Sequence, residues 1–431
     1  LQLQRIRYQA GRTRDAMLPF LPGTWTCRVA VRNVTSLMTS GPNPAAWRVH
    51  ILPADRAPEP LASGPTATSG ETARDEHAAD ESNKAPWTVP WGPGRWWVAG
   101  DLHQHSTESD GALDPGDLFL ANRRRRLAFM ALTDHQVLRP PANVPGLAVF
   151  GGTEITTPVG HVVALDAPTD RGLLELAPDA GPFGGCDWLK AACRTLRAAG
   201  AFLSACHPAF PPWDFRCGSL GDMPLDAVEI LCDPAHPRAA EAADAALALW
   251  TGLLEDGSTL VGIGGSDFHA FSSTEAGFPE AGAAPGLPMT FAGCPAGTRD
   301  PESVRSALRA GRVAVGCGLF PGFALLAGDR LATAGDTIFL PSDRQGRQSL
   351  GLGWRVRLAP FPGTPPGEPL HCALVGSGGR HDTVSLRLGE TAEKAWQPPD
   401  RPEGWIRMEV RNRDGQLLGF TNPVRWQRDR R

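Results

Sequence analysis

Nine residues between positions 103 and 269 have side chains that bind metal ions. They are His103, His105, Asp110, His135, Glu154, His161, His207, Asp267 and His269, and they include six of the chain's 11 histidines. Most of them follow short apolar runs, where a strand is expected to end in a loop. Imidazole and carboxylate ligands together suit Zn²⁺, Mn²⁺ or iron. The pattern therefore predicts a centre for more than one metal ion.

This prediction depends on the whole set, because each motif is ambiguous alone. His103 and His105 are two apart on a predicted strand, so their imidazoles point to the same face and can reach one cation. Such pairs also arise by chance, and a single histidine after a buried strand is more often a hydrogen-bonded structural residue. Taken singly, Asp110, Glu154 and His161 are typical loop residues. Chance rarely supplies five or six successive strands that all end in His, Asp or Glu.

Composition limits the classes of protein to consider. The chain has 431 residues, 42% of them hydrophobic, which is enough for two or three domains with a large core. A net charge of −4 and a pI near 6.3 give no general basis for binding nucleic acid or anionic membrane. No apolar run is long enough to span a bilayer, and nothing indicates an oligomeric state.

The cysteines and the start of the chain bear on its location. Nine cysteines are scattered without a CxxC pair, and a disulfide scaffold is not expected at this length. Reduced thiols favour the cytoplasm. Basic residues at the start have no apolar segment behind them, so no signal peptide is expected. Because the first residue is Leu1, a periplasmic location after removal of a leader stays open.

Changes in composition divide the chain into four parts. Residues 1–53 contain predicted β-strands. Residues 54–95 are rich in Pro, Ala, Ser and acidic residues, which predicts a linker or a long loop. Residues 96–325 predict alternating strands and helices, and residues 326–431 predict antiparallel strands.

In the third part, helix signals and buried apolar runs follow one another. Asp-Pro pairs at 114–115 and 300–301 predict helix starts, and Gly200 predicts a helix end. Helices are expected near 115–126, 187–199, 238–254 and 301–310, and strands at 97–99, 127–132, 201–205, 227–231 and 260–263. This α/β alternation predicts a parallel sheet or barrel with active-site residues at the carboxyl ends of its strands.

The two ends of the chain share another pattern. Residues 354–358 and 406–410 alternate with period two and are separated by turn-forming Pro and Gly, as in a small β-sandwich. Stretches 25–31 and 47–51 alternate in the same way, but two strands are too few to be stable alone. We expect them to complete the C-terminal sandwich, so that the α/β part is inserted between its pieces.

Together the motifs resemble the PHP (polymerase and histidinol phosphatase) superfamily over about residues 96–320. They are Gly-Asp-Leu-His-Gln-His-Ser at 100–106, Ser-Asp-Gly at 109–111, Thr-Asp-His at 133–135, Gly-Thr-Glu at 152–154, Gly-His at 160–161, His-Pro at 207–208 and Gly-Ser-Asp-Phe-His at 265–269. Three later motifs resemble the CehA/McbA-like branch, which includes carbaryl hydrolases. These are Leu-Pro-Met-Thr at 287–290, Ser-Ala-Leu-Arg-Ala-Gly-Arg at 306–312 and Thr-Asn-Pro at 421–423.

The resemblance implies a fold and a set of ligands. The fold would be a distorted (β/α)₇ barrel, TIM-like, with up to three metal ions. By this resemblance, His103, His105, Glu154 and Asp267 hold the first metal, Glu154, His161 and His207 hold the second, and Asp110, His135 and His269 hold the third. Glu154 would bridge the first two, since two neighbouring cations need negative charge between them.

These features predict a metal-dependent hydrolase with two or three divalent ions (Zn, Mn or Fe) and a small-molecule ester as its partner. We expect a metal-bridging hydroxide to attack a phosphomonoester or phosphodiester, with Glu154, His207 and Asp267 as catalytic residues. A carbamate or carboxylic ester hydrolase is the alternative reaction. A non-catalytic binding protein on the same scaffold is the rival, and it should have lost some ligands.

A few neighbouring residues have two interpretations. Asp134 either orients a metal-bound histidine or caps a turn, and Glu229 either supports the site or stabilises structure. The loop around Trp213 is expected over the mouth of the barrel. Arg216 in this loop is expected to be an ordinary surface arginine, and the arginines at 123–126 are expected to face solvent at a helix end.

Overall fold

The computed structural model describes residues 85–429, except for 170–171, 173–175, 178–179, 182–183, 272–283, 363 and 365–366. The strands predicted in residues 1–53, their packing on the C-terminal strands and most of the predicted linker lie outside the described residues. The end of the predicted linker contains β1 (Thr88–Pro90), which pairs antiparallel with β2 (Arg95–Asp101). This sheet therefore begins ahead of the boundary expected at residue 96.

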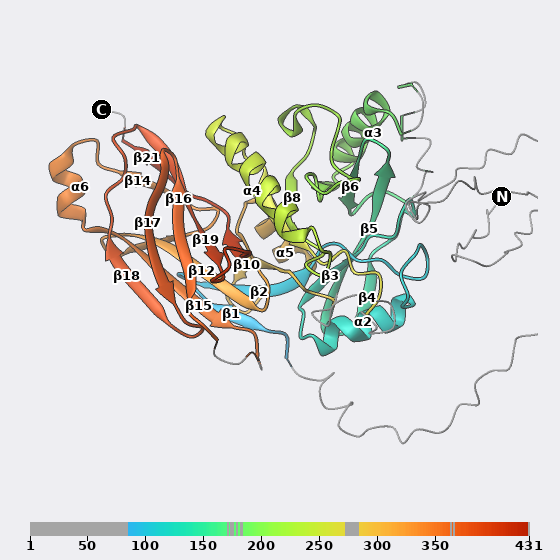
Figure 1. Ribbon diagram of the computed structural model, residues 1–431, viewed down its shortest axis with the longest axis horizontal. Helices are drawn as coiled ribbons and strands as arrows, with labels where there is room; N and C mark the ends of the chain where they lie inside the picture. Colours follow the sequence, from blue (N-terminus) through green and yellow to red (C-terminus); the bar gives the residue numbers. More distant parts are fainter. Residues whose placement is uncertain are drawn as a thin grey trace, which may run out of the picture. The chain divides into compact units, whose positions relative to one another are not determined.

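The described residues form a mixed α/β structure with few helices (Figure 1). The helices are α2 (Pro115–Arg124), α3 (Cys186–Ala198), α4 (Ala239–Glu255), α5 (Pro301–Arg309), α6 (Arg344–Leu350) and the short 3₁₀ helix η4 (Leu220–Asp222). The strands up to residue 316, after β2, are β3 (Phe129–Leu132), β4 (Ala142–Val144), β5 (Leu147–Thr157), β6 (Gly160–Leu165), β7 (Phe202–Cys206), β8 (Ala227–Cys232), β9 (Val261–Gly265), β10 (Met289–Pro295) and β11 (Val313–Gly316).

Local signals place the helix ends where the sequence predicts them. The Asp114 carboxylate accepts a hydrogen bond from the backbone N–H of Asp117 (3.0 Å) at the start of α2. Asp300 accepts one from Ser303 N–H (2.9 Å) at the start of α5. Gly200, just after α3, has a φ of +96°, which a glycine adopts without strain. These caps confirm the predicted starts of α2 and α5 and the predicted end of α3.

The order of strand pairing differs from the expected all-parallel arrangement. Pairs β2–β3, β3–β5, β7–β8 and β8–β9 are parallel. Strand β6 pairs antiparallel with both β5 and β7, so the expectation of an all-parallel sheet is wrong at this point. Only Pro158 and Val159 separate β5 from β6, and two residues can form a hairpin but not a crossover helix.

Hydrogen bonds connect β9 and the residues after it to two other parts of the chain. Asp267 N–H donates to His103 O, and His105 N–H donates to Phe268 O, both at 2.9 Å. These bonds place the segment after β9 beside the segment after β2. Further back along β9, Asn422 accepts from Gly262 N–H (2.9 Å) and donates to Gly262 O (2.7 Å).

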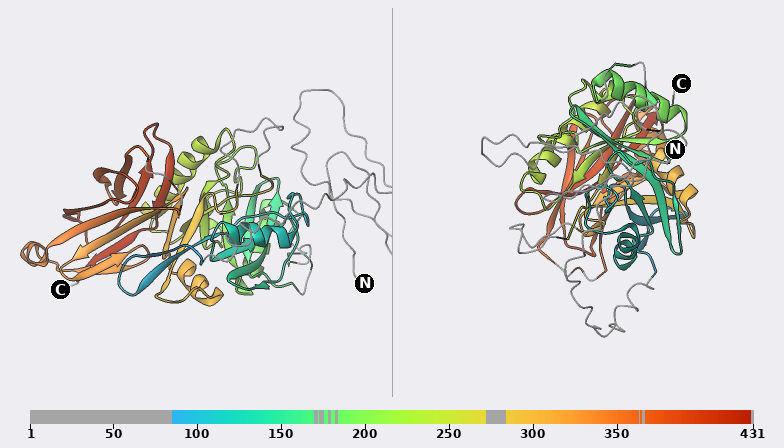
Figure 2. Two further views of the ribbon diagram at one scale, coloured as in Figure 1. Left: turned by 90° about the horizontal axis from the view of Figure 1, so that it is seen from below. Right: turned by 90° about the vertical axis from the view of Figure 1, so that its right-hand side faces the viewer.

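The C-terminal strands form two sets (Figures 1 and 2). One is a four-stranded antiparallel sheet of β13 (Arg330–Thr333), β12 (Leu319–Ala327), β15 (Leu352–Pro360) and β18 (Thr391–Ala395). The other contains β14 (Thr337–Leu340), β16 (Leu370–Gly376), β17 (Gly379–Leu386), β19 (Glu403–Arg411), β20 (Leu417–Thr421) and β21 (Val424–Arg428). Pairing of β20 with β11 joins this second set to the α/β strands.

Separate groups of apolar side chains support the two regions. One cluster lies among the α/β strands and α3, α4 and α5, and includes Trp188 and Trp250. Another contains side chains from both C-terminal sets, among them Trp354 and Trp426. Arg407 on β19 is fully buried beside the first cluster, with its guanidinium 4.6 Å from the Trp250 ring. In the part of the chain that is described, no helix is long and apolar enough to cross a membrane.

Candidate metal centre

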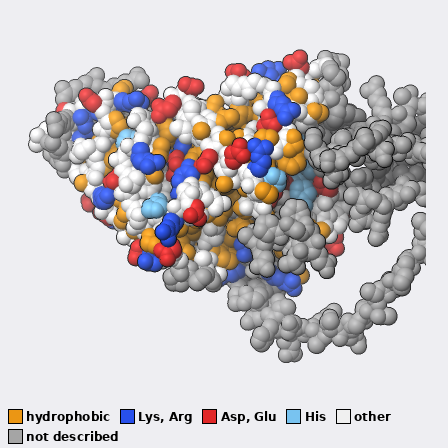
Figure 3. Space-filling view, in the orientation of Figure 1, with side chains coloured by type: hydrophobic (Ala, Val, Ile, Leu, Met, Phe, Trp, Pro, Cys, Tyr) orange, Lys and Arg blue, Asp and Glu red, His pale blue; other side chains and the backbone are white. Residues whose placement is uncertain are grey.

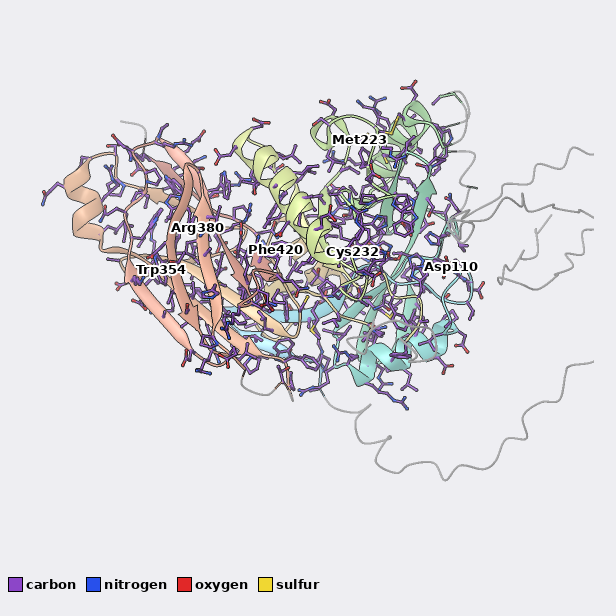
Figure 4. All side chains as sticks on the ribbon, viewed as in Figure 1. Asp110, Met223, Cys232, Trp354, Arg380 and Phe420 are labelled. Carbon is purple, nitrogen blue, oxygen red and sulfur yellow. A yellow bond between two sulfur atoms is a disulfide. The ribbon has the colours of Figure 1, made fainter. Side chains whose placement is uncertain are left out.

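All nine predicted ligands fall into three groups that share residues, and Figure 4 labels one of the nine, Asp110. His103 and His105 follow β2, His135 follows β3, His207 directly follows β7, and the pair Asp267 and His269 follows β9. Asp110 is on the loop after β2, whereas Glu154 and His161 lie within β5 and β6. Glu154 and His161 therefore lie in a hairpin, and not in the loops that their motifs suggest when each is taken alone.

A first group consists of His103, His105, Glu154 and Asp267. The Nε2 atoms of both histidines lie 3.3 Å from Glu154 Oε2. The same two atoms lie 3.3 and 3.0 Å from Asp267 Oδ1. Two ligand atoms that each lie about 2.0–2.2 Å from one cation are roughly 3–3.5 Å apart. The spacing in this group therefore fits a shared metal ion.

The second group uses the other oxygen of the same glutamate. Glu154 Oε1 lies 2.7 Å from His161 Nδ1 and 3.5 Å from His207 Nε2. All three residues are buried. Because its two oxygens face different groups, Glu154 is placed as a bridging carboxylate would be.

A third group is nearer to solvent. Asp110 Oδ1 lies 3.3 Å from His269 Nε2, and Asp110 Oδ2 lies 3.4 Å from His135 Nε2. The side chains of Asp110 and His269 are 30% and 37% exposed, compared with 1% for Glu154. His105 also belongs to this group by distance, with Nδ1 4.0 Å from Asp110 Oδ1, and the sequence did not predict that.

Several buried polar atoms of these groups lack a hydrogen bond in the described part of the chain, which indicates whether metal ions fit between them. Nε2 of His103, both ring nitrogens of His105 and Oε2 of Glu154 are buried and have no hydrogen-bond partner among the described residues. Leaving such atoms unsatisfied costs free energy, so native proteins rarely do it. Cations between these atoms would satisfy them. The donor set of imidazoles and carboxylates suits Zn²⁺, Mn²⁺ or iron.

The charges of the ligands are strongly coupled. Burial alone would lower the pKa of His103, but the carboxylates of Asp267, Glu229 and Glu154 raise it well above its usual value. At His135 burial again favours a lower pKa, but neighbouring carboxylates, mainly that of Glu154, raise the pKa to about 10.

Two other residues of the centre, Glu154 and His105, have a lowered pKa. Burial would raise the pKa of Glu154, yet the histidines around it hold this pKa well below the usual range. His105 has a pKa lowered to about 4 by burial and by His269 and His135. The pKa shifts of His103, His135 and Glu154 therefore show that the centre favours positive charge opposite its carboxylates, which bound cations would supply.

Three buried carboxylates accept hydrogen bonds from the segments that carry the proposed ligands. Asp101 accepts hydrogen bonds from Ser266 N–H (3.0 Å) and Gly286 N–H (2.6 Å), which fixes the chain just before Asp267. Asp101 lies two residues before His103 at the end of β2 and is not among the residues that the sequence predicts to act in the centre. The other two are Asp134 and Glu229, whose roles the sequence left open.

Asp134 supports a loop, not a histidine. Its carboxylate accepts from Ser106 N–H, Ser106 Oγ–H and Ser109 Oγ–H, each at 2.8 Å. Both serines belong to the segment that leads to Asp110. Of the two interpretations, the structure therefore favours stabilisation of the turn that carries a ligand of the third group.

A loop after β7 covers one side of the second group. The rings of Phe210 and Trp213 lie 6.4 and 6.3 Å from the ring of His207. Arg216 is exposed and pairs with Asp214 (2.8 Å), as expected of a surface arginine. Histidine side chains reach the surface beside hydrophobic ones in this part of the molecule (Figure 3).

A disulfide between Cys186 and Cys217 ties the end of this loop to the start of α3, with 5.2 Å between the Cα atoms. The expectation that all thiols are reduced is therefore wrong for this pair. Cys193, Cys206 and Cys232 lie in apolar runs of the sequence and are free and buried. Cys317 lies in a similar run but is only partly buried.

Comparison with known proteins adds a distant likeness. No protein-family model and no curated protein matches the sequence. Among solved structures, the chain is similar to a two-domain protein from Bacteroides vulgatus ATCC 8482 that contains a predicted PHP-like metal-dependent phosphoesterase. The sequence identity is 17%, the TM-score is 0.40, and the match covers 79% of this chain and 99% of that chain. The function proposed for this chain therefore depends on the geometry of its metal centre.

Proposed function

We propose that this protein is a metal-dependent hydrolase with two or three divalent ions, Zn²⁺, Mn²⁺ or Fe²⁺. One observation carries the proposal: three overlapping groups of His, Asp and Glu atoms, two of which share Glu154. A carboxylate that faces two cation positions at once is suited to the two-metal sites that align an attacking water with a substrate. All nine ligand-competent residues are present, which argues against a scaffold that has lost its activity.

The chain's own residues would do most of the positioning. We assign Glu154, His207 and Asp267 to catalysis: Glu154 would lie between the first two ions, Asp267 would hold the first and His207 the second. Bound divalent ions would supply Lewis acidity, which lowers the pKa of a water molecule and stabilises negative charge on the substrate. Burial of Glu154 and the histidines around it excludes bulk water, so electrostatic stabilisation is stronger there than in solution.

We also propose that β2, β3, β5, β6, β7, β8 and β9 form a distorted seven-stranded barrel. Support comes from the hydrogen bonds between residues 103–105 and 267–268, which connect the two ends of the series. The right-hand view in Figure 2, in which helices surround the strands, agrees with this arrangement. The C-terminal sets would form a β-sandwich around the cluster that contains Trp354 and Trp426. The disulfide favours an oxidising compartment, such as the periplasm, over the cytoplasm expected from the sequence.

The substrate we propose is a small phosphomonoester or phosphodiester. Three cations held close together by these ligands would create a strongly positive electrostatic potential. An anionic phosphoryl group would be bound more favourably there than a neutral ester. Phosphoryl oxygens can also contact more than one ion. A carbamate or carboxylic ester is the alternative, because a single carbonyl oxygen can use the same centre.

Three substrates with the same leaving group test this ranking. We would compare kcat/KM of the metal-loaded enzyme for 4-nitrophenyl phosphate, bis(4-nitrophenyl) phosphate and 4-nitrophenyl N-methylcarbamate, which share one leaving group. The proposal expects a phosphoester to be preferred by at least about tenfold, or about 1.4 kcal/mol in transition-state stabilisation. A preference for the carbamate would reverse the ranking while leaving the metal assignment intact. Asp267→Asn serves as the control for contaminating esterase activity.

A further inference from the structure

Glu229 lies in the fourth group of potential ligands, with His103 and Cys232, but its contacts differ from those of a metal ligand. It is on β8 and is only 2% exposed. The pairing of β8 with β9 shifts register between Glu229 and Leu231, so Ile230 is an extra residue that forms a bulge. A bulge changes the direction of neighbouring side chains. Here it accompanies a carboxylate that points into the metal centre.

The two oxygens of Glu229 contact ligands of two different groups. Nδ1 of His103 lies 3.2 and 3.3 Å from Oε1 and Oε2. The backbone N–H of His207 donates to Oε2 at 2.9 Å. When Nε2 of His103 faces a metal, its Nδ1 carries the proton and donates to a partner, commonly a carboxylate. Glu229 is therefore the partner that sets the tautomer and ring orientation of His103.

Two features of the backbone fit this carboxylate: the glycine at position 265 and the positive φ of His207. A Cβ atom at Gly265 would lie 2.4 Å from Glu229 Oε1 and 2.4 Å from His103 Cβ, so only glycine leaves room for the pair. His207 has a φ of +29°, which is unusual for a residue with a side chain and costs free energy unless other contacts hold it. The bond from His207 N–H to Glu229 is such a contact.

We propose that Glu229 is a positioning residue that couples the first two metal positions, by orienting His103 of the first group and holding the chain at His207 of the second. This inference rests on the proposed metal centre. Glutamine has the same size, but it lacks the negative charge and has one accepting oxygen where the carboxylate has two. In Glu229→Gln, an amide oxygen in the place of Oε1 leaves an NH₂ group facing His207 N–H. In the place of Oε2, one uncharged oxygen must accept from both His207 N–H and His103 Nδ1–H, so both contacts are weakened.

The test measures metal affinity, which does not depend on turnover. Metal-free protein is titrated with Zn²⁺ against a chelator of known affinity, and the successive dissociation constants are compared. For Glu229→Gln, the affinity of two ions should fall by about 10- to 100-fold, the range usual for such partners of metal-bound histidines. The affinity of the third ion should stay within about twofold of wild type. Glu229→Asp keeps the charge but is too short to span both contacts, so at least one affinity should fall.

Asp134→Asn is the matched control, because it also replaces a buried carboxylate by an amide. Asp134 holds Ser106 and Ser109 in the segment between His105 and Asp110, so this variant should leave the ion of the second group at wild-type affinity, which Glu229→Gln should not. Thermal melting of each metal-free variant measures any general loss of stability.

Three outcomes would overturn the proposal. Wild-type affinities in both Glu229 variants would exclude coupling, and an equal loss at all three ions together with a lower Tm would indicate a general structural role. A wild-type protein that binds no Zn²⁺ would remove the metal centre itself, and the proposed function with it. Normal Zn²⁺ binding without turnover of any ester would count against the reaction alone.

Discussion

Glu154 and His161 face each other across the β5–β6 hairpin, with Oε1 of Glu154 2.7 Å from Nδ1 of His161. In the hairpin register Glu154 pairs with Val163, and Thr156 pairs with His161. Side chains two apart on a strand share a face, so Glu154 and His161 are diagonal neighbours on the face of the metal centre. A one-residue shift in this register would turn one of them away. The hairpin therefore determines that the first and second groups share a carboxylate.

Replacing this shared carboxylate should remove more than one ion. We expect Glu154→Ala, measured by elemental analysis after gel filtration, to retain at least one metal ion fewer than a single-group variant does. Asp110→Ala provides that comparison, because Asp110 belongs only to the third group. If each variant loses one ion, Glu154 is not a bridge.

Loss of a ligand should affect turnover and not folding. His207 and Asp267 have φ angles of +29° and +51°, and asparagine tolerates such backbone angles better than most residues do. We expect His207→Asn and Asp267→Asn to lower kcat at least about 100-fold, because losing a ligand should cost no less than losing its hydrogen-bond partner. Circular dichroism should show an unchanged fold. Substantial activity in either variant would contradict the assignment of that residue to catalysis.

The metal-free protein should lose stability at alkaline pH. The folded-state pKa of His135 is about 10 and that of His269 about 9, because neighbouring carboxylates outweigh burial, whereas the ordinary value is 6.5. Groups with a raised pKa stabilise the fold fully below about pH 6.5, and this contribution is lost as the pH rises through about 9–10. The Tm of metal-free protein should therefore fall between pH 7 and pH 10 by at least about 2–4 °C, the shift that roughly 1 kcal/mol produces.

Metal-loaded protein provides the comparison for this experiment. Bound ions keep these imidazoles deprotonated, so its Tm should depend less on pH over the same range. At acid pH the sign reverses for His105, since its pKa of about 4 makes protonation more favourable in the unfolded chain. Equal pH profiles with and without metal would contradict the charge pairing that the structure shows.

The disulfide should stabilise the loop beside His207. Cys186 and Cys217 are 31 residues apart in sequence, and bridges of this kind typically contribute about 2–4 kcal/mol. We expect dithiothreitol to lower the unfolding free energy of the wild type in urea by roughly that amount. The variant Cys186→Ser, Cys217→Ser should be equally destabilised, and insensitive to the reductant. Wild-type stability that does not respond to reduction would indicate that the bridge contributes little.

Local patterns in the sequence were enough to predict much of the fold. The Asp-Pro pairs before α2 and α5 and the glycine after α3 act within one helical turn, so no distant contact was needed to identify them. The β5–β6 hairpin was different. Its first strand is buried along almost its whole length, and such a strand lacks the alternation that identifies a half-exposed one.

By itself the sequence determined the kinds of ligand and their approximate positions, because metal chemistry selects imidazole and carboxylate, and strands place them at their ends. Only the tertiary structure decided which atoms come together. Glu154 contacts both His135 and His161, and Glu229 contacts a histidine 126 positions away. These contacts depend on strand register, on a bulge in β8 and on a glycine that leaves space for the Glu229–His103 pair. Such features arise from packing between distant segments, which spacing along the chain does not encode.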